Sequence, residues 1–313
     1  MKRRLGRFRA SFRRAGSTLA EIFRALWMLI EHRRAGQPQY RFTVRDAVLF
    51  GLERSWRPQS AEVDRGATPG LSVVTVGATA VHWPTHLAVD GLSWMYEEVN
   101  APFWRNPSSY SHPETIRGRV DWVVDGGSCE GYFAEFARRS LSVPHIYLVE
   151  ARADIAAALR TTFAPQIDSG EMEIWEVALG AAAGPVRLMA ADGLPWETRV
   201  AEAAVDLAVR GGDLEALSEV RAETLDALLR DRCVRGTGLI KLDVEGAEEA
   251  VLAGAVETMR SLKPRLSVAV YHGRDNAERC KAKILEANPT YRVRFRGMYG
   301  WASPLRPYML FAW

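Results

Sequence analysis

The sequence predicts an α/β protein built on a doubly wound, mostly parallel sheet. The first observation is the apolar run Val120–Val124, which stops at Asp125 and is followed by three glycines within six residues. Helical spacing resumes at Tyr132, so this stretch has the strand, glycine turn and helix of a nucleotide-binding edge. The second observation is Gly238–Leu242, another strand that ends in acidic residues. Together they predict a ligand site beyond the carboxyl ends of parallel strands.

The glycine loop favours a cationic ligand over one that carries phosphate. The spacing of Gly126, Gly127 and Gly131 does not match the dinucleotide pattern Gly-x-Gly-x-x-Gly. The loop also begins with Asp125 and contains Glu130, and both carboxylates would repel a phosphate. Glycine still has a use here, because a side chain would keep the backbone away from a ligand. An NAD-dependent oxidoreductase is therefore the weaker alternative for this fold.

The other elements of the sheet follow along the chain. Ile146–Glu150 is predicted to be the second strand, and Glu150 lies about 20 residues beyond the glycines, where an acid commonly accepts hydrogen bonds from two ribose hydroxyls. Residues 181–219 are predicted to be an insertion with helices at Leu207–Val209 and Leu214–Val220. The remaining predicted elements are helices at Asp154–Phe163, Gly246–Leu262 and Asn276–Ala287, strands at Glu173–Ala178 and Leu266–Tyr271, and an antiparallel pair at Tyr291–Phe295 and Tyr308–Trp313.

Two motifs match those of a known family, in the same order. They are Asp-Gly-Gly-Ser-Cys-Glu-Gly-Tyr at Asp125–Tyr132 and Lys-Leu-Asp-Val-Glu-Gly-Ala-Glu at Lys241–Glu248. They resemble the motifs Asp-x-Gly-Ala-Asn-x-Gly-Tyr and Lys-x-Asp-Val-Glu-Gly-x-Glu of the FkbM-type family of S-adenosylmethionine-dependent methyltransferases. Val177–Gly180 and Thr224–Asp226 match further landmarks of that family. The resemblance covers roughly residues 118–313.

The resemblance implies a fold, a cofactor and a set of site residues. The fold would be an α/β, doubly wound, mostly parallel seven-stranded methyltransferase (Rossmann-like) sheet with an N-terminal helical and β extension. S-adenosylmethionine would be the cofactor, and no metal ligand is assigned. The residues at the matching cofactor-binding positions are Asp125, Gly126, Gly127, Ser128, Gly131, Glu150, Ala178 and Asp243. The chain departs from the family at Ser128 and Cys129, where Ala and Asn are usual, and at Ala151, where Pro is common.

Two residues are predicted to assist the transfer itself. Methyl transfer from a sulfonium is an in-line displacement, so the site must hold the acceptor near the methyl group and remove its proton. His272 follows the fifth strand and is predicted to take that proton. Asp243 follows the fourth strand and would orient the acceptor hydroxyl or favour positive charge on the donor. The alternatives are a structural or surface role for His272 and a helix cap after Gly246 for Asp243.

These features predict an O-methyltransferase that acts on a hydroxyl of a sugar, a glycolipid or polysaccharide, or a secondary metabolite. The alternative from another class is a non-catalytic module of the same fold that docks on a membrane or a partner through residues 1–34. The intact acids Asp125, Glu150 and Asp243 favour the enzyme, whereas the altered Ser128–Cys129 pair keeps the alternative open.

The N-terminal segment carries an excess of positive charge. Residues 1–34 contain ten Lys and Arg against two Glu, whereas the rest of the chain is slightly acidic and the net charge is only +3. This distribution argues against a nucleic-acid partner. Thr18–Glu21 is a capping pattern, and the apolar residues that follow at helical spacing are Leu19, Ile22, Phe23, Leu26, Trp27 and Ile30. This helix is predicted either to dock on an anionic membrane or to pack on the rest of the chain.

The predicted organisation has three parts. Residues 1–70 would form a basic arm, the amphipathic helix and a linker with one helix at Val44–Leu52, and residues 118–313 the methyltransferase domain. Residues 71–117, with short strands, would form a flap on the acceptor side. The tryptophans of this flap either line an acceptor pocket or form its core; they are Trp83, Trp94 and Trp104.

The cellular location is predicted from the cysteines and from hydropathy. Three scattered cysteines without CxxC spacing suit a reducing cytoplasm. No apolar run approaches the roughly 18 residues that a membrane-spanning helix needs. The expected location is therefore cytoplasmic, with peripheral contact at the inner membrane surface if the N-terminal helix docks there.

Overall fold

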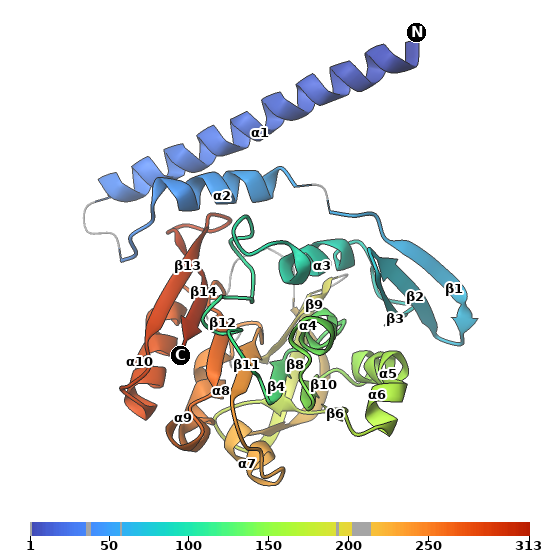
Figure 1. Cartoon of the computed structure of the whole chain (residues 1–313), viewed down its shortest axis with the longest axis vertical. Coiled ribbons are helices and arrows are strands. Elements are labelled where there is room, and N and C mark those ends of the chain that lie inside the picture. The colour runs from blue at the N-terminus through green and yellow to red at the C-terminus, as the bar shows by residue number, and fades with distance from the viewer. Residues whose placement is uncertain (1, 36–38, 57, 192–193, 202–213) are drawn as a thin grey trace.

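The centre of the molecule is a seven-stranded sheet with the strand order β13-β14-β12-β11-β4-β5-β6 (Figure 1). The computed structural model describes residues 2–35, 39–56, 58–191, 194–201 and 214–313. Every neighbouring pair from β12 to β6 is parallel, and β14 is antiparallel to β12 and β13. The strands are β4 (Trp122–Gly126), β5 (Ile146–Val149), β6 (Met172–Trp175), β11 (Gly238–Leu242), β12 (Arg265–Ala269), β13 (Val293–Tyr299) and β14 (Arg306–Ala312). The predicted doubly wound fold is confirmed.

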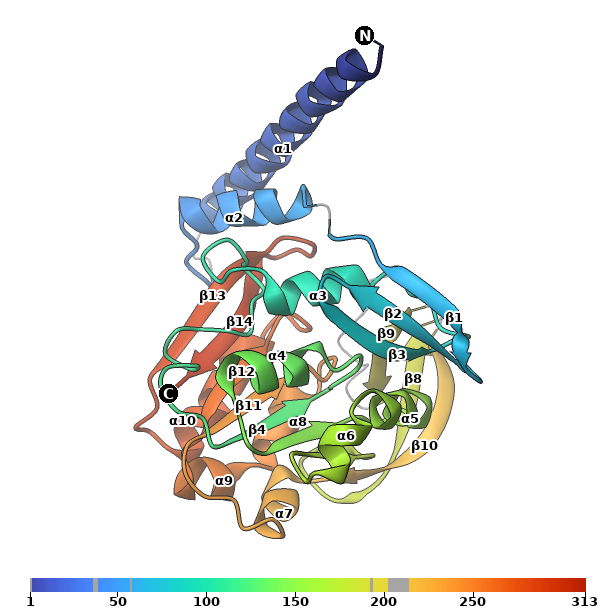
Figure 2. The ribbon, with the colours of Figure 1, turned by 45° about the vertical axis from the view of Figure 1, so that its right-hand side comes forward.

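Helices cover the sheet, so its central strands are buried along their whole length. All residues of β4 and β11 are buried, which explains why both read as apolar runs rather than as an alternating pattern. Helix α3 (Leu92–Asn100) packs beside α4, while α8, α9 and α10 pack near one another (Figure 2). The helices of this region are α4 (Tyr132–Leu141), α5 (Ala153–Thr162), α6 (Ala164–Asp168), α7 (Leu225–Arg230), α8 (Glu248–Ala253), α9 (Val256–Ser261) and α10 (Asn276–Ala287).

The chain reverses its direction of travel across the sheet at β4. From β4 it proceeds through β5 to β6 on one side, and later returns through β11 and β12 on the other. Gly126, the last residue of β4, is level with Val149 of β5 and Leu242 of β11. The loops after these three strands therefore meet at one edge, which is the usual ligand position in open α/β sheets.

The insertion after β6 is a second, four-stranded sheet with the order β7-β10-β8-β9. Its strands are β7 (Ala178–Leu179), β8 (Gly184–Ala191), β9 (Leu194–Val200) and β10 (Leu214–Glu223). The prediction of a helix at Leu214–Val220 is wrong, because this segment pairs with β8 from Leu214 to Ala222. The predicted helix at Leu207–Val209 lies outside the described residues. Tertiary pairing here overrides a local pattern that fits a helix.

The segment Gly246–Leu262 forms two helices, α8 and α9, rather than the predicted single one. The break comes at Gly254, which approaches the preceding loop closely. A Cβ at Gly254 would lie 2.1 Å from the carbonyl oxygen of Gly180, and the Gly254 carbonyl accepts a hydrogen bond from the amide of Asp226. The contact leaves no room for a side chain at this position, and only glycine permits it.

The N-terminal region adds a helical hairpin and a small sheet to the central α/β fold. Its elements are α1 (Lys2–Arg34), α2 (Val44–Arg54), β1 (Glu62–Thr68), β2 (Leu71–Val76) and β3 (Thr79–Pro84). Helix α1 begins at Lys2 and not at Thr18, because the arginine-rich arm continues the helix; arginine is a good helix former. The predicted linker contains β1 as well as α2. In Figures 1 and 2 the N-terminal half of α1 projects beyond the rest of the molecule.

Helices α1 and α2 touch at a glycine. A Cβ at Gly51 would lie 2.5 Å from the Cα of Ile22, so the two backbones are in close contact. Ala25 and Leu29 of α1 are buried in the same interface, and Arg54 pairs with Glu21 at 2.5 Å. One face of α1 is therefore buried by packing against α2.

Candidate active site

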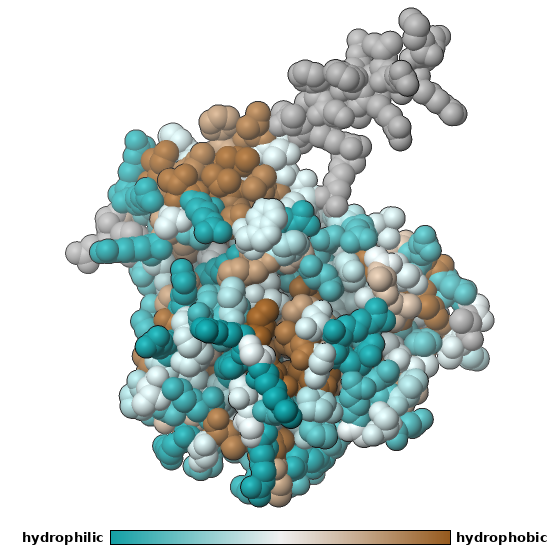
Figure 3. Space-filling view, viewed as in Figure 1, coloured by the Kyte–Doolittle hydropathy of each residue, from teal (hydrophilic) through white to brown (hydrophobic). Residues whose placement is uncertain are grey.

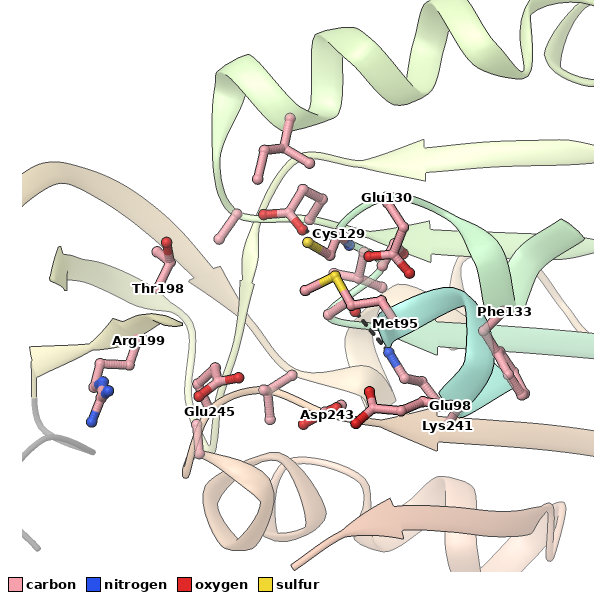
Figure 4. A pocket seen from close by; sticks show the side chains of 18 of the residues that line it. Met95, Glu98, Cys129, Glu130, Phe133, Thr198, Arg199, Lys241, Asp243 and Glu245 are labelled. Carbon is pink, nitrogen blue, oxygen red and sulfur yellow. Dashed lines mark hydrogen bonds between the residues drawn. The ribbon is translucent and has the colours of Figure 1, made fainter. Parts of the chain in front are cut away.

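A cavity of about 550 Å³ lies at the carboxyl ends of β4, β5 and β11. Its floor is the loop after β4, and its walls come from the ends of β5, β7 and β11, from β8 and β9, and from α2, α3 and the β13–β14 turn. Figure 4 shows Lys241, Asp243 and Glu98 on one side and Thr198 and Arg199 of β9 on another. A cavity of this size and position suits a cofactor together with a small acceptor.

The glycine loop is held in place by backbone contacts to both neighbouring strands. The amides of Gly127 and Ser128 donate to the carbonyl of Val149 at 3.1 and 3.0 Å. Gly127 has φ +74°, and a Cβ there would lie 1.9 Å from the carbonyl oxygen of Asp243. Gly131 directly precedes α4 and has φ +86°, and its lack of a side chain leaves room for the ring of Phe163. Glycine at position 127 lets the loop approach the backbone just after β11, and glycine at position 131 lets the ring of Phe163 pack against the loop.

A buried ion pair supports the loop from below. Asp125 is fully buried, and its Oδ1 lies 3.0 Å from Nζ of Lys241. Lys241 also donates to the carbonyl oxygen of Gly127 at 2.7 Å. Burial raises the pKa of Asp125, while Lys241 opposes that shift. Burial alone would lower the pKa of Lys241, but the carboxylates of Asp125 and Asp243 raise it, so the lysine stays charged.

Glu150 lines the cavity at the end of β5. Its Oε2 accepts a hydrogen bond from the amide of Cys129 at 3.0 Å, and its Oε1 accepts one from the amide of Arg152 at 2.9 Å. Each oxygen keeps a second lone pair for a ligand hydroxyl. Burial raises the pKa of Glu150, and the two amide hydrogen bonds lower it again. This carboxylate can accept two hydrogen bonds from a diol.

Asp243 faces the cavity, and His272 lies behind it. The hydroxyl of Tyr110 donates to Oδ2 of Asp243. Nε2 of His272 lies 3.4 Å from Oδ1 of Asp243 and 3.5 Å from Oε2 of Glu245, and Nδ1 lies 3.0 Å from Oε1 of Glu248. Asp243 and Glu245 line the cavity, whereas His272 is 5% exposed and is absent from its walls.

The carboxylates around His272 shift its pKa. Burial by itself would lower its pKa, but the carboxylates of Glu248 and Glu245 raise the pKa well above the usual value. Helix α8 has no side-chain cap, so Asp243 does not have the alternative capping role. The loop before α8 is instead held by Glu248, whose Oε1 accepts hydrogen bonds from the amides of Val244 and Gly246 at 3.1 and 3.2 Å.

Three further acids line the cavity. Burial raises the pKa of Glu130 to about 7, and that of Glu53 also to about 7. Burial, reinforced by the nearby Asp243, raises the pKa of Glu98 well above its ordinary value. These carboxyl groups are strong hydrogen-bond partners for hydroxyl groups and a poor environment for an anionic ligand.

The structure places the predicted site residues in two layers. Gly127, Ser128, Glu150, Ala178 and Asp243 line the cavity. Asp125, Gly126, Gly131 and His272 lie outside the lining and contact residues of the loop or of the cavity wall. Of the three tryptophans, only Trp94 lines the cavity: Trp83 is fully buried and Trp104 is 65% exposed.

Three residues that line the cavity are missed by the prediction from sequence: Lys241, Tyr110 and Glu98. A signal for Lys241 was present, because a lysine inside an apolar buried strand is rare unless it has a partner. Tyr110 contacts Asp243 across 133 residues of sequence, and no local pattern indicates such a contact.

A comparison with models of protein families identifies the family of this chain. The family model described as the methyltransferase FkbM domain matches residues 125–294, which is more than half of the chain. This chain belongs to the FkbM methyltransferase family. Members are S-adenosylmethionine-dependent, and the matched region contains the glycine loop, Glu150, Asp243 and His272. Among curated proteins, no sequence matches this FkbM-family chain significantly.

Solved structures of low sequence identity resemble parts of this FkbM-family protein. The methyltransferase FkbM of Methylobacillus flagellatus is 16% identical, with a TM-score of 0.45, and the match covers 72% of this chain and 56% of that one. TYW2 of M. jannaschii, solved with AdoMet, is 12% identical with a TM-score of 0.37, covering 79% and 85%. The precorrin-6y C5,15-methyltransferase of Geobacter metallireducens is 12% identical with a TM-score of 0.36, covering 64% and 83%.

Proposed function

We propose that this protein transfers the methyl group of S-adenosylmethionine to a hydroxyl group of a sugar, a glycolipid or polysaccharide, or a secondary metabolite. The observation that carries the proposal is that Asp243 lines the same cavity as Glu150 and the glycine loop. A carboxylate that can orient the acceptor hydroxyl therefore lines the same cavity as the acid expected to bind the ribose of the donor.

The acceptor side of the cavity supports a hydroxyl-rich, uncharged substrate. Glu53, Glu98 and Tyr110 contribute carboxyl and hydroxyl groups, and Trp94 and Trp301 contribute aromatic surface. Such a mixture of hydrogen-bonding groups and aromatic faces suits a sugar-like or polyketide-like molecule. The acids make a nucleic-acid acceptor unfavourable, because its phosphates would meet like charge.

The proposal is tested by a transfer assay with a donor labelled on its methyl group. The full chain is incubated with lipid and polysaccharide extracts of the source cell, and the labelled product is hydrolysed to locate the methyl group. Label in an ether linkage to oxygen supports the proposal. Label on nitrogen or carbon would contradict it, and donor binding without transfer to any extract favours the non-catalytic alternative.

We infer that Asp243 contacts the acceptor hydroxyl, and that His272 positions Asp243 and Glu245 from behind. The prediction that His272 itself takes the proton stays a prediction. Its burial and its three carboxylate neighbours favour the positioning role. In either role, the residue belongs to the group of side chains that must be in place for transfer.

Replacing Glu150 by alanine is expected to weaken S-adenosylmethionine binding by about 1.5–3 kcal/mol, the range for hydrogen bonds to a charged group. Glu150→Gln keeps one acceptor oxygen and should lose less. The matched control is Glu173→Ala on the neighbouring strand β6, since Glu173 pairs with Arg232 away from the cavity. Calorimetry measures all four affinities, and equal values for wild type and Glu150→Ala would remove Glu150 from the site.

We also propose that the outer face of α1 docks reversibly on an anionic membrane. The exposed apolar side chains of this face lie one helical turn apart and form the brown patch over the C-terminal half of α1 in Figure 3. They are Leu19 (55% exposed), Phe23 (68%), Trp27 (58%) and Ile30 (41%). The sequence of the segment is strongly basic, which complements anionic lipid. No described helix has the length and apolarity to cross a bilayer.

Vesicle co-sedimentation tests this docking. The full chain is expected to bind anionic but not neutral vesicles, with binding that fades as salt rises, since each basic residue near the surface contributes about 1 kcal/mol. The double variant Phe23→Ser/Trp27→Ser should lose binding, whereas Trp104→Ser, at an equally exposed tryptophan elsewhere, should keep it. A chain that starts near Gly36 should also lose binding, although it uncovers the face of α2 that packs on Ala25 and Leu29. Unchanged binding in the double variant would contradict the proposal.

A further inference from the structure

Two carboxylates and an imidazole converge at the wall of the cavity. Asp243 and Glu245 follow β11, and His272 follows β12. One ligand atom from each of the three side chains lies within 4.8 Å of those of the others. Because β11 and β12 are adjacent and parallel, the loops at their carboxyl ends lie side by side and bring these residues together.

The atoms that face one another in this cluster lack hydrogen bonds. Among the described residues, neither Nε2 of His272 nor Oδ1 of Asp243 has a hydrogen-bond partner, although both atoms are buried. His272 is 95% buried, and polar atoms at such depth nearly always find a partner. A ligand that accepts lone pairs from both atoms would satisfy them.

The distances match those between ligands of one metal ion. Nε2 of His272 is 3.4 Å from Asp243 and 3.5 Å from Glu245, longer than the roughly 2.9 Å of a good hydrogen bond. Two ligand atoms that each lie about 2.1 Å from an ion are about 3.0–3.4 Å apart in octahedral or tetrahedral geometry. An ion between the three side chains therefore requires only small side-chain movements.

Neighbouring groups orient each ligand toward this point. The hydroxyl of Tyr110 donates a hydrogen bond to Oδ2 of Asp243, so Oδ1 stays available to bind an ion. Glu248 lies 3.0 Å from Nδ1 of His272, so a proton on Nδ1 leaves the lone pair of Nε2 directed at the cluster. Glu248 is in turn fixed by Asn276, which donates to its Oε2 at 2.9 Å. A carboxylate behind a histidine in this way is the common outer arrangement of metal sites.

We propose that Asp243, Glu245 and His272 bind a divalent cation, and that this ion also binds the acceptor oxygen. The site itself stands on the geometry, and its role in transfer rests on the proposed function. Two carboxylates with one imidazole suit Mn²⁺ or Zn²⁺. Asp243 and Glu245 line the cavity, so an acceptor can reach the open positions of the ion (Figure 4).

The chemistry balances without a further reactant. Binding to the cation lowers the pKa of the acceptor hydroxyl, and its proton passes to solvent. The oxygen then forms a bond to the methyl carbon while the bond from that carbon to the sulfonium sulfur breaks. The products are a methyl ether and the neutral thioether S-adenosylhomocysteine. The cation and its carboxylates keep their charges throughout.

Mn²⁺ titration followed by electron paramagnetic resonance tests the site without any methyl acceptor. The full chain, freed of metal by a chelator, should take up one Mn²⁺ per chain, and ¹⁵N labelling of histidine should alter the nitrogen coupling to the bound ion. His272→Ala and Asp243→Asn should weaken binding at least about 10-fold, and Glu248→Gln about 10–100-fold through the lost support of His272. His145→Ala, at an exposed histidine, should bind as wild type does.

The outcomes separate this site from the proposed function. Stoichiometric Mn²⁺ uptake with histidine coupling that His272→Ala abolishes supports the site. A wild-type chain that binds S-adenosylmethionine but takes up no Mn²⁺ overturns it, and so does uptake that is unchanged in a folded His272→Ala variant. A chain that binds Mn²⁺ but no methyl donor overturns the methyltransferase proposal and leaves the cation site standing.

Discussion

Turnover is expected to fall by about 10²–10⁴-fold when Asp243 is replaced by asparagine, while the affinity for S-adenosylmethionine stays near that of the wild type. Asparagine has the same size and can still accept the hydrogen bond of Tyr110, so the wall of the cavity keeps its shape. What it loses is the negative charge, which is needed either to attract the acceptor proton or to bind a cation.

The control for this substitution is Asp64→Asn, at an exposed aspartate of β1 that does not line the cavity. It should leave both turnover and stability near the wild-type values. Single-turnover kinetics on folded protein gives the rate of the chemical step directly. An Asp243→Asn variant that turns over normally but melts earlier would show that the residue is structural, and its catalytic assignment would then be wrong. His272→Ala is expected to lower turnover in the same direction.

The free energy of unfolding is expected to fall by about 3–5 kcal/mol when Lys241 is replaced by methionine, because the substitution leaves Asp125 buried without its partner. The matched control is Lys283→Met. Lys283 pairs with Glu286 on the surface of α10, and exposed pairs of this kind are worth about 0–1 kcal/mol. Urea unfolding of both variants measures the difference.

The free energy of unfolding that is lost in Lys241→Met should be larger at high pH than at low pH. Burial already raises the pKa of Asp125 above that of the unfolded chain, and removing Lys241 raises it further. The folded variant then binds more protons than the unfolded chain between the two pKa values, so its stability falls as pH rises through that window. The deficit should shrink below about pH 4, where Asp125 is protonated in both states. A deficit that is equal at pH 4 and pH 8, or one no larger than that of Lys283→Met, would contradict the ion-pair account. The further change Asp125→Asn should recover part of the loss.

The sequence predicts those elements that depend on neighbouring residues, through the spacing of apolar side chains and the positions of glycines. The helix Asn276–Ala287 agrees with α10 at both ends because its apolar face repeats at helical spacing. The glycine loop is recognisable in the sequence because only glycine fits where Gly127 meets the backbone of Asp243, just after β11. The acids at strand ends were grouped because parallel strands bring their carboxyl ends together, and Glu150 and Asp243 do line one cavity.

The remaining features depend on contacts between distant parts of the chain. Leu214–Val220 fits a helix locally but becomes β10 through its pairing with β8. Gly254 breaks the helix after β11 because it packs on Gly180, which is 74 residues earlier in the sequence. Tyr110 reaches Asp243 from a segment without regular structure. In each case the contact that determines the structure joins residues that are tens of positions apart. Periodicity and motif spacing do not indicate contacts of this kind.

The central claim is that the cavity beyond β4, β5 and β11 binds S-adenosylmethionine, and calorimetric titration of the full chain tests it most directly. The chain is titrated in separate experiments with S-adenosylmethionine, S-adenosylhomocysteine and NAD. The account predicts saturable binding of the first two at one site per chain, mutual competition between them, and no heat of binding with NAD. Binding of NAD in competition with S-adenosylhomocysteine, or no binding of either sulfur ligand by folded protein, would contradict it.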